Sequence, residues 1–310
     1  MADRIDITVA VCTWNRAALL DQTLTALAAV TPPPGRSWEV LVIDNNSPDH
    51  TQQVLAAHAG RLPLRTVTER QQGHSNARNC GLDHARGDWL VWTDDDVRPA
   101  AGWLAAFAAT IQRQPAAAAV GGPIRPWFPE PPDPELAAVF TPLRIGYCGV
   151  DHGRDERELT PAELIYGANM AFRTAAVAGL RFDPLYGRKG KHQGGHDDVA
   201  YLDQVRARGG RVWWSPGMSL EHYVEPSRMT VEYARRYTRD AVCLHELDPD
   251  NVPRLAGIPR WLLRKAAGHW LAAAVNLRPG RRRERLRALL ALWDTQARIS
   301  AHRQAARAVS

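Results

Sequence analysis

Cysteine is scarce in this sequence, and its few cysteines form no pattern typical of a metal site or a disulfide scaffold. None of the four belongs to a Cys-x-x-Cys pair. This spacing argues against a zinc ribbon and a disulfide framework, and it favours a reducing, cytosolic compartment. The four are scattered along the chain: Cys12, Cys80, Cys148 and Cys243.

Long apolar runs are also missing. The longest uncharged candidate, residues 266–277, has 12 residues and includes His269 and Asn276, whereas a membrane span needs roughly 18. The N-terminus has no basic stretch followed by an apolar one, so we expect no signal peptide. A Gly-x-Gly-x-x-Gly motif is absent after the first expected strand, which argues against a nicotinamide-dependent dehydrogenase.

What is present is typical of a soluble globular protein, with an uneven distribution of charge. The 310 residues are 45% hydrophobic and 23% charged, which is ordinary for such proteins. Residues 254–310 hold 13 Lys/Arg against two acids, a net charge of +11; because the whole chain carries +6, the remainder carries −5. A basic C-terminal segment on an acidic body indicates contact with an anionic surface.

Apolar runs and helical periodicities alternate along the first two thirds of the chain. This alternation predicts an α/β fold with a mostly parallel sheet covered by helices on both faces. The expected strands are residues 7–12, 38–43, 64–68, 89–93, 164–172 and 211–214. The expected helices are residues 17–30, 51–59, 75–85 and 199–208.

Acidic residues cluster at two places in the chain, and the first is where this fold would bind a ligand. Asp94, Asp95 and Asp96 directly follow the buried strand 89–93, and Asp197-Asp198 follow a glycine-rich basic stretch. Adjacent carboxylates repel one another, so such clusters are tolerated mainly where a cation compensates them. Open α/β sheets bind ligands at the carboxyl ends of their strands. The first cluster therefore predicts a divalent-metal site.

Two other strands also end in polar residues, Thr13-Trp14-Asn15 and Asp44-Asn45-Asn46. Convergence of three polar strand ends at one sheet edge is a stronger signal than any one of them. Residues 123–134 contain six prolines, which favours an irregular loop over this site.

The basic C-terminal segment predicts two amphipathic helices separated by Pro279-Gly280. Two alternatives follow: the helices lie in the headgroup layer of an anionic membrane, or they pack on the catalytic domain. On the first helix, the expected apolar face comprises Trp261, Leu262, Leu263, Ala266, Trp270, Leu271 and Ala274. On the second, it comprises Leu286, Leu289, Leu290 and Trp293.

Taken together, the motifs of residues 7–237 resemble those of family 2 glycosyltransferases, which have a GT-A fold, invert the anomeric centre and use a nucleotide-sugar donor. Their order and spacing make the resemblance specific. The segments that carry it are residues 9–16, 42–47, 73–82, 87–99, 167–173, 195–198 and 221–222.

The resemblance implies a role for most of the candidate residues. Asp94 and Asp96 fall on the Asp-x-Asp motif that holds Mn²⁺ or Mg²⁺ against the donor diphosphate, and His222 falls on the position of a third metal ligand. Whether both acids touch the metal, or one acts through water or ribose, stays open. Nucleotide-sugar contacts are implied for Thr13, Asn15, Arg16, Asp44, Asn46, Arg78, Asp94, Asp95 and Asn169.

The second acidic pair is implied to supply the general base. The family usually has Glu-Asp there, with the second acid as base; Asp198 takes that position and Asp197 replaces the Glu. The shorter Asp197 leaves open which acid acts. For Asp44, a helix-capping role is the alternative, and for Arg78 a solvated helix face.

The resemblance implies a hexosyltransferase that acts once per acceptor, because the Gln-x-x-Arg-Trp motif of chain-extruding synthases is absent. We expect a catalytic domain at residues 1–230, with a nucleotide-binding half (1–99) and an acceptor half (100–230), followed by helices at 231–310. The expected partners are a nucleotide-sugar donor, which the resemblance suggests is a UDP-sugar, and a sugar or lipid-linked sugar acceptor, with no nucleic acid. The expected location is cytoplasmic, peripheral on the inner face of the cell membrane, in cell-surface polysaccharide or glycolipid synthesis.

The rival hypothesis is a haloacid-dehalogenase-type phosphatase with Asp94 as nucleophile. That family also places Asp-x-Asp after an apolar strand. It normally does so on the first strand, whereas about ninety residues of βα units precede Asp94 here.

Overall fold

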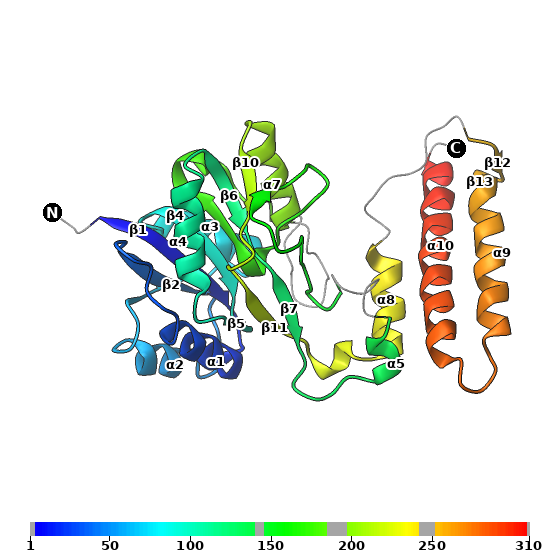
Figure 1. Cartoon of the computed structure of the whole chain (residues 1–310), viewed down its shortest axis with the longest axis horizontal. Helices are drawn as coiled ribbons and strands as arrows, with labels where there is room; N and C mark the ends of the chain where they lie inside the picture. Colours follow the sequence, from blue (N-terminus) through cyan, green and yellow to red (C-terminus); the bar gives the residue numbers. More distant parts are fainter. Residues whose placement is uncertain (1–3, 140–145, 185–196, 242–251, 309–310) are drawn as a thin grey trace. The chain divides into compact units, whose positions relative to one another are not determined.

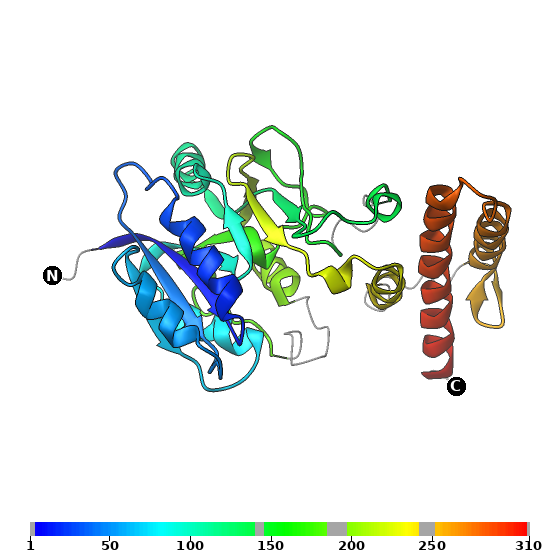
Figure 2. The ribbon, with the colours of Figure 1, turned by 90° about the horizontal axis from the view of Figure 1, so that it is seen from below.

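A computed structural model of the chain describes residues 4–139, 146–184, 197–241 and 252–308. The chain forms two compact units, each described by itself (Figures 1 and 2). The first unit comprises residues 1–125 and 149–223, and the second comprises 126–148 and 224–310. The boundary at 223 lies near the expected one at 230, but the inclusion of 126–148 in the second unit was not expected.

The first unit begins with the expected alternation of strands and helices. β1 (Ile5–Thr13), β2 (Trp38–Asp44), β3 (Leu64–Thr68) and β4 (Gly87–Asp94) run parallel in the order β3-β2-β1-β4. They alternate with α1 (Ala17–Ala28), α2 (Thr51–His58) and α3 (His74–His84). The runs of β1, β2 and β4 are almost wholly buried, as expected of parallel strands covered on both faces.

Four further strands complete an eight-stranded mixed sheet. β9 (Met170–Arg173) pairs antiparallel with β4 and with β6 (Ala117–Gly121), and β10 (Arg211–Trp214) pairs with β6 and with β8 (Arg157–Glu158). Helices α4 (Trp103–Arg113) and α7 (Asp197–Ala207) belong to this half. The expected strand at 164–172 is shortened to β9, because Gly167–Asn169 form a 3-10 turn that precedes it.

A small second sheet brings a late strand to the acidic cluster. It has the order β5-β11-β7, from β5 (Val97–Pro99), β11 (Leu220–Tyr223) and β7 (Ile124–Trp127). In the β11–β5 register His222 lies opposite Val97. The sheet thus places a histidine beside a carboxylate cluster that is more than a hundred residues away in sequence.

The proline-rich segment is more regular than expected. Residues 123–134 include β7, and α5 (Pro134–Ala137) begins at the last proline instead of an irregular loop continuing there. Proline is tolerated in the first helical turn because its missing N–H would have no helical partner. Asp133 caps this helix by accepting hydrogen bonds from the Glu135 and Leu136 amides at 2.9 and 3.1 Å.

The second unit is helical. It contains α5, α8 (Val231–Ala241), a β-hairpin of β12 (Arg254–Leu255) and β13 (Ile258–Pro259), α9 (Arg260–Val275) and α10 (Arg282–Ala308). Its core joins residues from the insert, α8 and α10. These are Leu136, Val139, Tyr147, Val224, Tyr233, Ala234, Leu286 and Leu290, with Trp293 packed against them. None of the described helices is both long and apolar enough to cross a membrane.

The two C-terminal helices differ from the expected pair of exposed apolar stripes. The stripe of α10 is buried at Leu286 and Leu290, so packing within the unit covers it. In α9, however, Leu262 and Ala273 are buried while Trp261 and Trp270 are exposed. The expected single apolar face of α9 is therefore wrong, because some of its apolar residues are buried and others are exposed.

Candidate active site

The polar strand ends meet at one edge of the sheet, as the sequence predicts. In the parallel registers Thr13 lies opposite Asp44, and Cys12 lies opposite Asp94. β1 and β2 thus end level with each other, and β4 ends one residue earlier relative to β1. Asp95 and Asp96 follow at once in the turn before β5.

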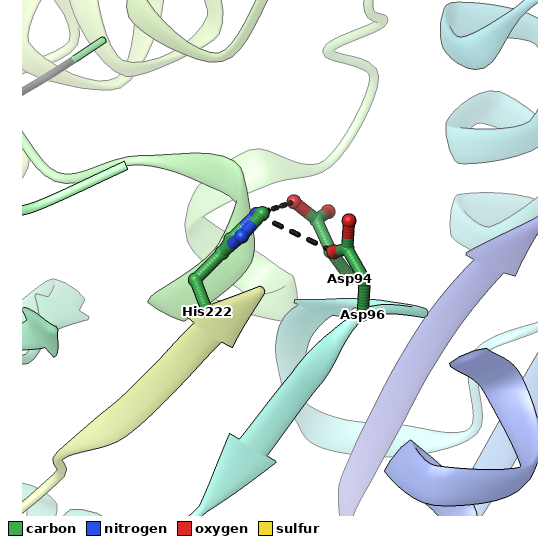
Figure 3. Close-up of side chains that lie close together, drawn as sticks. All are labelled: Asp94, Asp96 and His222. Atoms are coloured by element: carbon green, nitrogen blue, oxygen red, sulfur yellow. Dashed lines mark ion pairs between the residues drawn. The ribbon is translucent and has the colours of Figure 1, made fainter. Parts of the chain in front are cut away.

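Asp94, Asp96 and His222 form a group suited to a metal ion (Figure 3). One ligand atom from each lies within 4.8 Å of the other two. His222 Nε2 lies 3.5 Å from Asp94 Oδ2 and 3.4 Å from Asp96 Oδ1. The other ring nitrogen, Nδ1, lies 2.9 Å from the Tyr223 carbonyl oxygen, an interaction that would fix the orientation of a ligating imidazole.

An observation that does not depend on sequence motifs also indicates that this group could bind a divalent cation. Asp96 Oδ1 is buried and has no hydrogen-bond partner. A buried polar atom without a partner is energetically costly, and a bound cation would give this oxygen a partner. Carboxylate oxygens with one imidazole nitrogen suit Mn²⁺, and carboxylates suit Mg²⁺. Burial alone would raise the pKa of Asp94, but the neighbouring His222, together with Arg78 and His74, outweighs it and holds that pKa below its ordinary value.

Asp95 faces a different set of partners. It accepts a hydrogen bond from Thr13 Oγ1 at 2.7 Å, and Arg16 Nη1 lies 3.0 Å from it and 2.8 Å from Asp96 Oδ2. Burial and the charge of Asp96 raise the pKa of Asp95 to about 7. Thr13 and Arg16, both predicted to contact the donor, are thus part of the carboxylate cluster.

The second acidic pair lies at the start of α7, with both residues in its first turn. Expectation placed the start of this helix at Val199, after the pair. The N-terminus of a helix favours negative charge, because its amides and dipole point there. Asp198 Oδ2 accepts a hydrogen bond from the Gly167 amide and Oδ1 one from the Val199 amide, each at 2.9 Å.

Asp197 is held by side chains at the start of α3. Its Oδ2 lies 3.1 Å from Arg78 Nη1, 3.4 Å from Ser75 Oγ and 3.4 Å from His74 Nδ1. Arg78 is 3% exposed, so the alternative of a solvated helix face is wrong. The two acids therefore differ: Asp197 is paired with a buried guanidinium, whereas Asp198 is bonded to backbone amides.

Electrostatics separate the two acids further. Burial raises the pKa of Asp198, and the nearby Asp197 adds to this, while Arg78 opposes it. Arg78 interacts electrostatically with Asp94 as well as with both members of the pair. One buried cation thus influences both acidic clusters.

The remaining predicted donor residues are placed at the same edge. Asp44 accepts hydrogen bonds from the Ser47 amide at 2.9 Å and from Gln52 at 2.6 Å, so it organises the turn that leads to α2. Asn15 and Asn46 are exposed, and their backbones adopt the left-handed conformation, with φ values of 53° and 61°. Asparagine tolerates this conformation better than most residues.

Asn169, another predicted donor contact, is buried and bonded on all sides to other segments. It is 1% exposed. Its amide donates to the Pro123 and Met218 carbonyls at 3.1 and 2.7 Å and accepts from Trp103 Nε1 at 2.9 Å. Through these bonds Asn169 holds three segments of the first unit together, and its contact with the donor sugar stays a prediction.

Two residues near the site were given no role of their own in the sequence analysis. Asn45 donates to the Glu69 and Gln71 carbonyls and accepts from the Gly73 amide, so it shapes the loop that leads to α3. Gly167 leaves room for Arg78: a Cβ at Gly167 would lie 1.7 Å from Arg78 Nη2. The glycine was visible in the motif, but its neighbour could not be read from sequence.

Comparison with known proteins identifies the family. Residues 8–135 match the sequence model of Glycosyl transferase family 2. The succinoglycan biosynthesis protein ExoM of Rhizobium meliloti is 34% identical over 245 residues, which cover 74% of this chain and 71% of ExoM. The chain belongs to glycosyl transferase family 2. This membership overturns the alternative of a phosphatase with Asp94 as nucleophile.

Solved structures of glycosyltransferases share the GT-A fold of this enzyme. A mannosyltransferase from Pyrobaculum calidifontis, in complex with GDP-Man and Mn²⁺, has a TM-score of 0.56 at 22% sequence identity. The match covers 94% of this chain and 86% of the mannosyltransferase chain. S. aureus TarS 1-349, in complex with UDP, has a TM-score of 0.55 at 16% identity and covers 99% of this chain and 92% of its own.

Proposed function

We propose that this glycosyltransferase is a metal-assisted, inverting hexosyltransferase that moves a sugar from a nucleotide diphosphate to an acceptor hydroxyl. The observation that carries the proposal is the group of Asp94, Asp96 and His222 at the carboxyl end of β4. Asp94, Asp96 and His222 would hold Mn²⁺ or Mg²⁺. When bound, the ion would neutralise charge that develops on the departing diphosphate.

Asp198 is the general base in this proposal. Its raised pKa favours proton uptake, and its neighbour Asp197 is already paired with Arg78. A carboxylate oxygen of Asp198 takes the proton from the acceptor hydroxyl while the hydroxyl oxygen of the acceptor bonds to the anomeric carbon of the sugar. The bond between that carbon and the diphosphate oxygen breaks on the opposite face, so the nucleoside diphosphate leaves and the configuration inverts.

The donor is proposed to lie along the edge formed by β1, β2 and β4. Thr13, Asn15 and Asn46 are available there beside Asp44, while Asp95 and Arg16 connect this edge to the proposed metal ligands. UDP and GDP are both candidate nucleotides, since solved structures of this fold include one with UDP and one with GDP-Man, and the resemblance to the family favours UDP. A screen of UDP- and GDP-sugars for nucleotide release distinguishes the two bases.

The proposed acceptor is a sugar or lipid-linked sugar at the cytoplasmic face of a membrane, with the enzyme bound peripherally. Support comes from the net charge of +11 on residues 254–310 against −5 on the remainder. Anionic lipid attracts such a segment. Similarity to a succinoglycan biosynthesis protein favours a place in cell-surface polysaccharide synthesis.

Thermal shift with UDP and Mn²⁺ tests the metal proposal. Asp94→Ala and Asp96→Ala should each abolish the stabilisation that UDP gives in the presence of Mn²⁺. Asp88→Ala is the matched control, because Asp88 lies at the other end of β4 and is half exposed. Full activity in excess chelator would reject the proposal.

A further inference from the structure

The surface of α9 carries large apolar side chains that nothing in the described residues covers. Trp270, Leu271, Val275 and Leu277 are 64, 59, 52 and 59% exposed, and Trp261 is 40% exposed. Large apolar side chains exposed together on one helix point to an interaction site. Both views show α9 and α10 as an antiparallel pair, with one side of α9 turned away from α10 (Figures 1 and 2).

Packing within the second unit explains α10 but not α9. Leu286 and Leu290 of α10 belong to the core of the unit. The contact between α9 and α10 uses other groups, including His269 and Thr295, whose side chains lie 3.2 Å apart. Neither Trp261 nor Trp270 belongs to the buried core of this unit.

Charge identifies the chemistry of the missing partner. α9 and the turn after it carry four exposed basic residues and no acid: Arg260, Arg264, Lys265 and Arg278. Lys265 Nζ lies over the Trp261 ring, 5.7 Å from its centroid. Long basic side chains can lay their apolar stems along a hydrophobic surface while their charges reach phosphates.

The length of α9 restricts how it could contact lipid. Its 16 residues extend roughly 24 Å at 1.5 Å per residue, less than the roughly 30 Å hydrocarbon core of a bilayer. A helix that is rich in Trp and Leu, cationic and too short to span is suited to the plane of the headgroup layer. A second copy of the chain fits less well, because two such faces would bring like charges together.

We infer that the exposed side of α9 is the surface through which the enzyme adsorbs to an anionic lipid bilayer, with Trp270, Leu271 and Val275 in the headgroup layer. This inference rests on the peripheral membrane contact proposed above and assigns it to one helix. It excludes the apolar stripe of α10, which the sequence made an equal candidate.

Flotation of the full-length enzyme with phosphatidylglycerol-containing and pure phosphatidylcholine vesicles tests the assignment. Binding should be stronger to the anionic vesicles and should weaken with salt. Arg264→Glu/Lys265→Glu should lower the partition coefficient at least tenfold, since each basic residue near an anionic surface contributes roughly fivefold. Trp270→Ala/Leu271→Ala should lower it by roughly tenfold at any salt concentration, because apolar burial is lost.

The matched control is Arg287→Glu/Arg303→Glu, which changes the net charge equally at exposed positions of α10. It should reduce binding far less than the α9 charge reversal. Equal loss from both double variants would overturn the assignment to α9, as would flotation that is absent or indifferent to lipid charge. A change of oligomeric mass in Trp270→Ala/Leu271→Ala, with flotation unchanged, would make the face a contact between copies.

Donor binding separates failure of this inference from failure of the proposed function. All three double variants should retain the full thermal shift with UDP and Mn²⁺, because none of their residues belongs to the first unit. Normal donor binding without flotation rejects the α9 surface alone. Flotation without donor binding rejects the proposed metal-assisted transfer alone.

Discussion

The two acids at the start of α7 have different surroundings, and this difference favours Asp198 as the proposed base. Asp198→Asn should retain donor and metal binding but reduce transfer about 10²–10⁴-fold, the usual contribution of a positioned base. Asp197→Asn should reduce it less, because Asp197 is paired with Arg78. Single-turnover kinetics measure the transfer rate of both variants, and a thermal shift with donor and metal checks that each still binds them. If Asp197→Asn is the variant that binds but does not transfer, Asp197 is the base instead of Asp198.

Arg78 should act as a positioning residue that tunes the base. Its positive charge lowers the pKa of Asp198, so Arg78→Met should raise that pKa. The acidic limb of the pH profile of kcat/KM should then move to higher pH by about one unit, since a close opposite charge changes the pKa of a carboxyl group by about 1–3. Arg78→Lys keeps the charge and should shift the limb less.

A double variant controls for the buried charge that Arg78→Met leaves on Asp197. Arg78→Met/Asp197→Asn removes both members of the pair, which proteins tolerate better than removal of one. Arg78 lowers the pKa of Asp198 and Asp197 raises it, so the two losses oppose each other and the limb should return toward its wild-type position. A slower rate with an unmoved limb in Arg78→Met would reject tuning by Arg78.

Sequence predicted which residues of the metal group come together but not which partners the other residues take. Asp94 and Asp96 adjoin one strand, and the motif order carried His222 to them. Arg78 and Asn169 are different, because a buried guanidinium or amide bonds to whatever tertiary packing brings near. Neither the Asp197 contact nor the Trp103 contact has any periodicity from which it could be read.

At the level of elements, the βα repeat was predictable because local pattern specifies it. α1, α2, α3 and their strands lie within a few residues of expectation. The faces of α9 and α10 were not predictable to the same degree. Periodicity tells which side chains share a face, whereas partners far along the chain decide which face is buried; Leu290 packs against residues contributed by α5 and α8.

The burial of α10 leads to a stability prediction. Leu290→Ala should lower the free energy of unfolding by about 2–5 kcal/mol, because it removes a buried side chain and leaves a cavity. Leu271→Ala, at a position 59% exposed, should change it by about 0.5 kcal/mol or less. Denaturant unfolding measures both, and equal effects would mean that α10 does not pack on this core.

At the level of the whole molecule, the chain enters the second unit twice. Residues 126–148 leave the first unit, contribute Leu136, Val139 and Tyr147 to the helical core, and return before β8. The expected boundary at residue 230 cuts through this core. A division of the sequence into consecutive domains cannot detect an insertion of this kind, because no local pattern in residues 126–148 indicates which distant residues they pack against.

Truncation after Thr230 tests the interdependence of the insert and the C-terminal helices. The shortened chain keeps Leu136, Val139 and Tyr147 but loses Tyr233, Leu286 and Leu290, which cover them in the full chain. Newly exposed apolar surface of this size promotes association, so residues 1–230 should aggregate or sediment as oligomers. Leu290→Ala in the full chain is the matched control and should stay monodisperse if the wild type does, because the covering helices remain. A monodisperse 1–230 fragment that binds UDP with Mn²⁺ as well as the full chain would instead support an autonomous catalytic domain ending at residue 230.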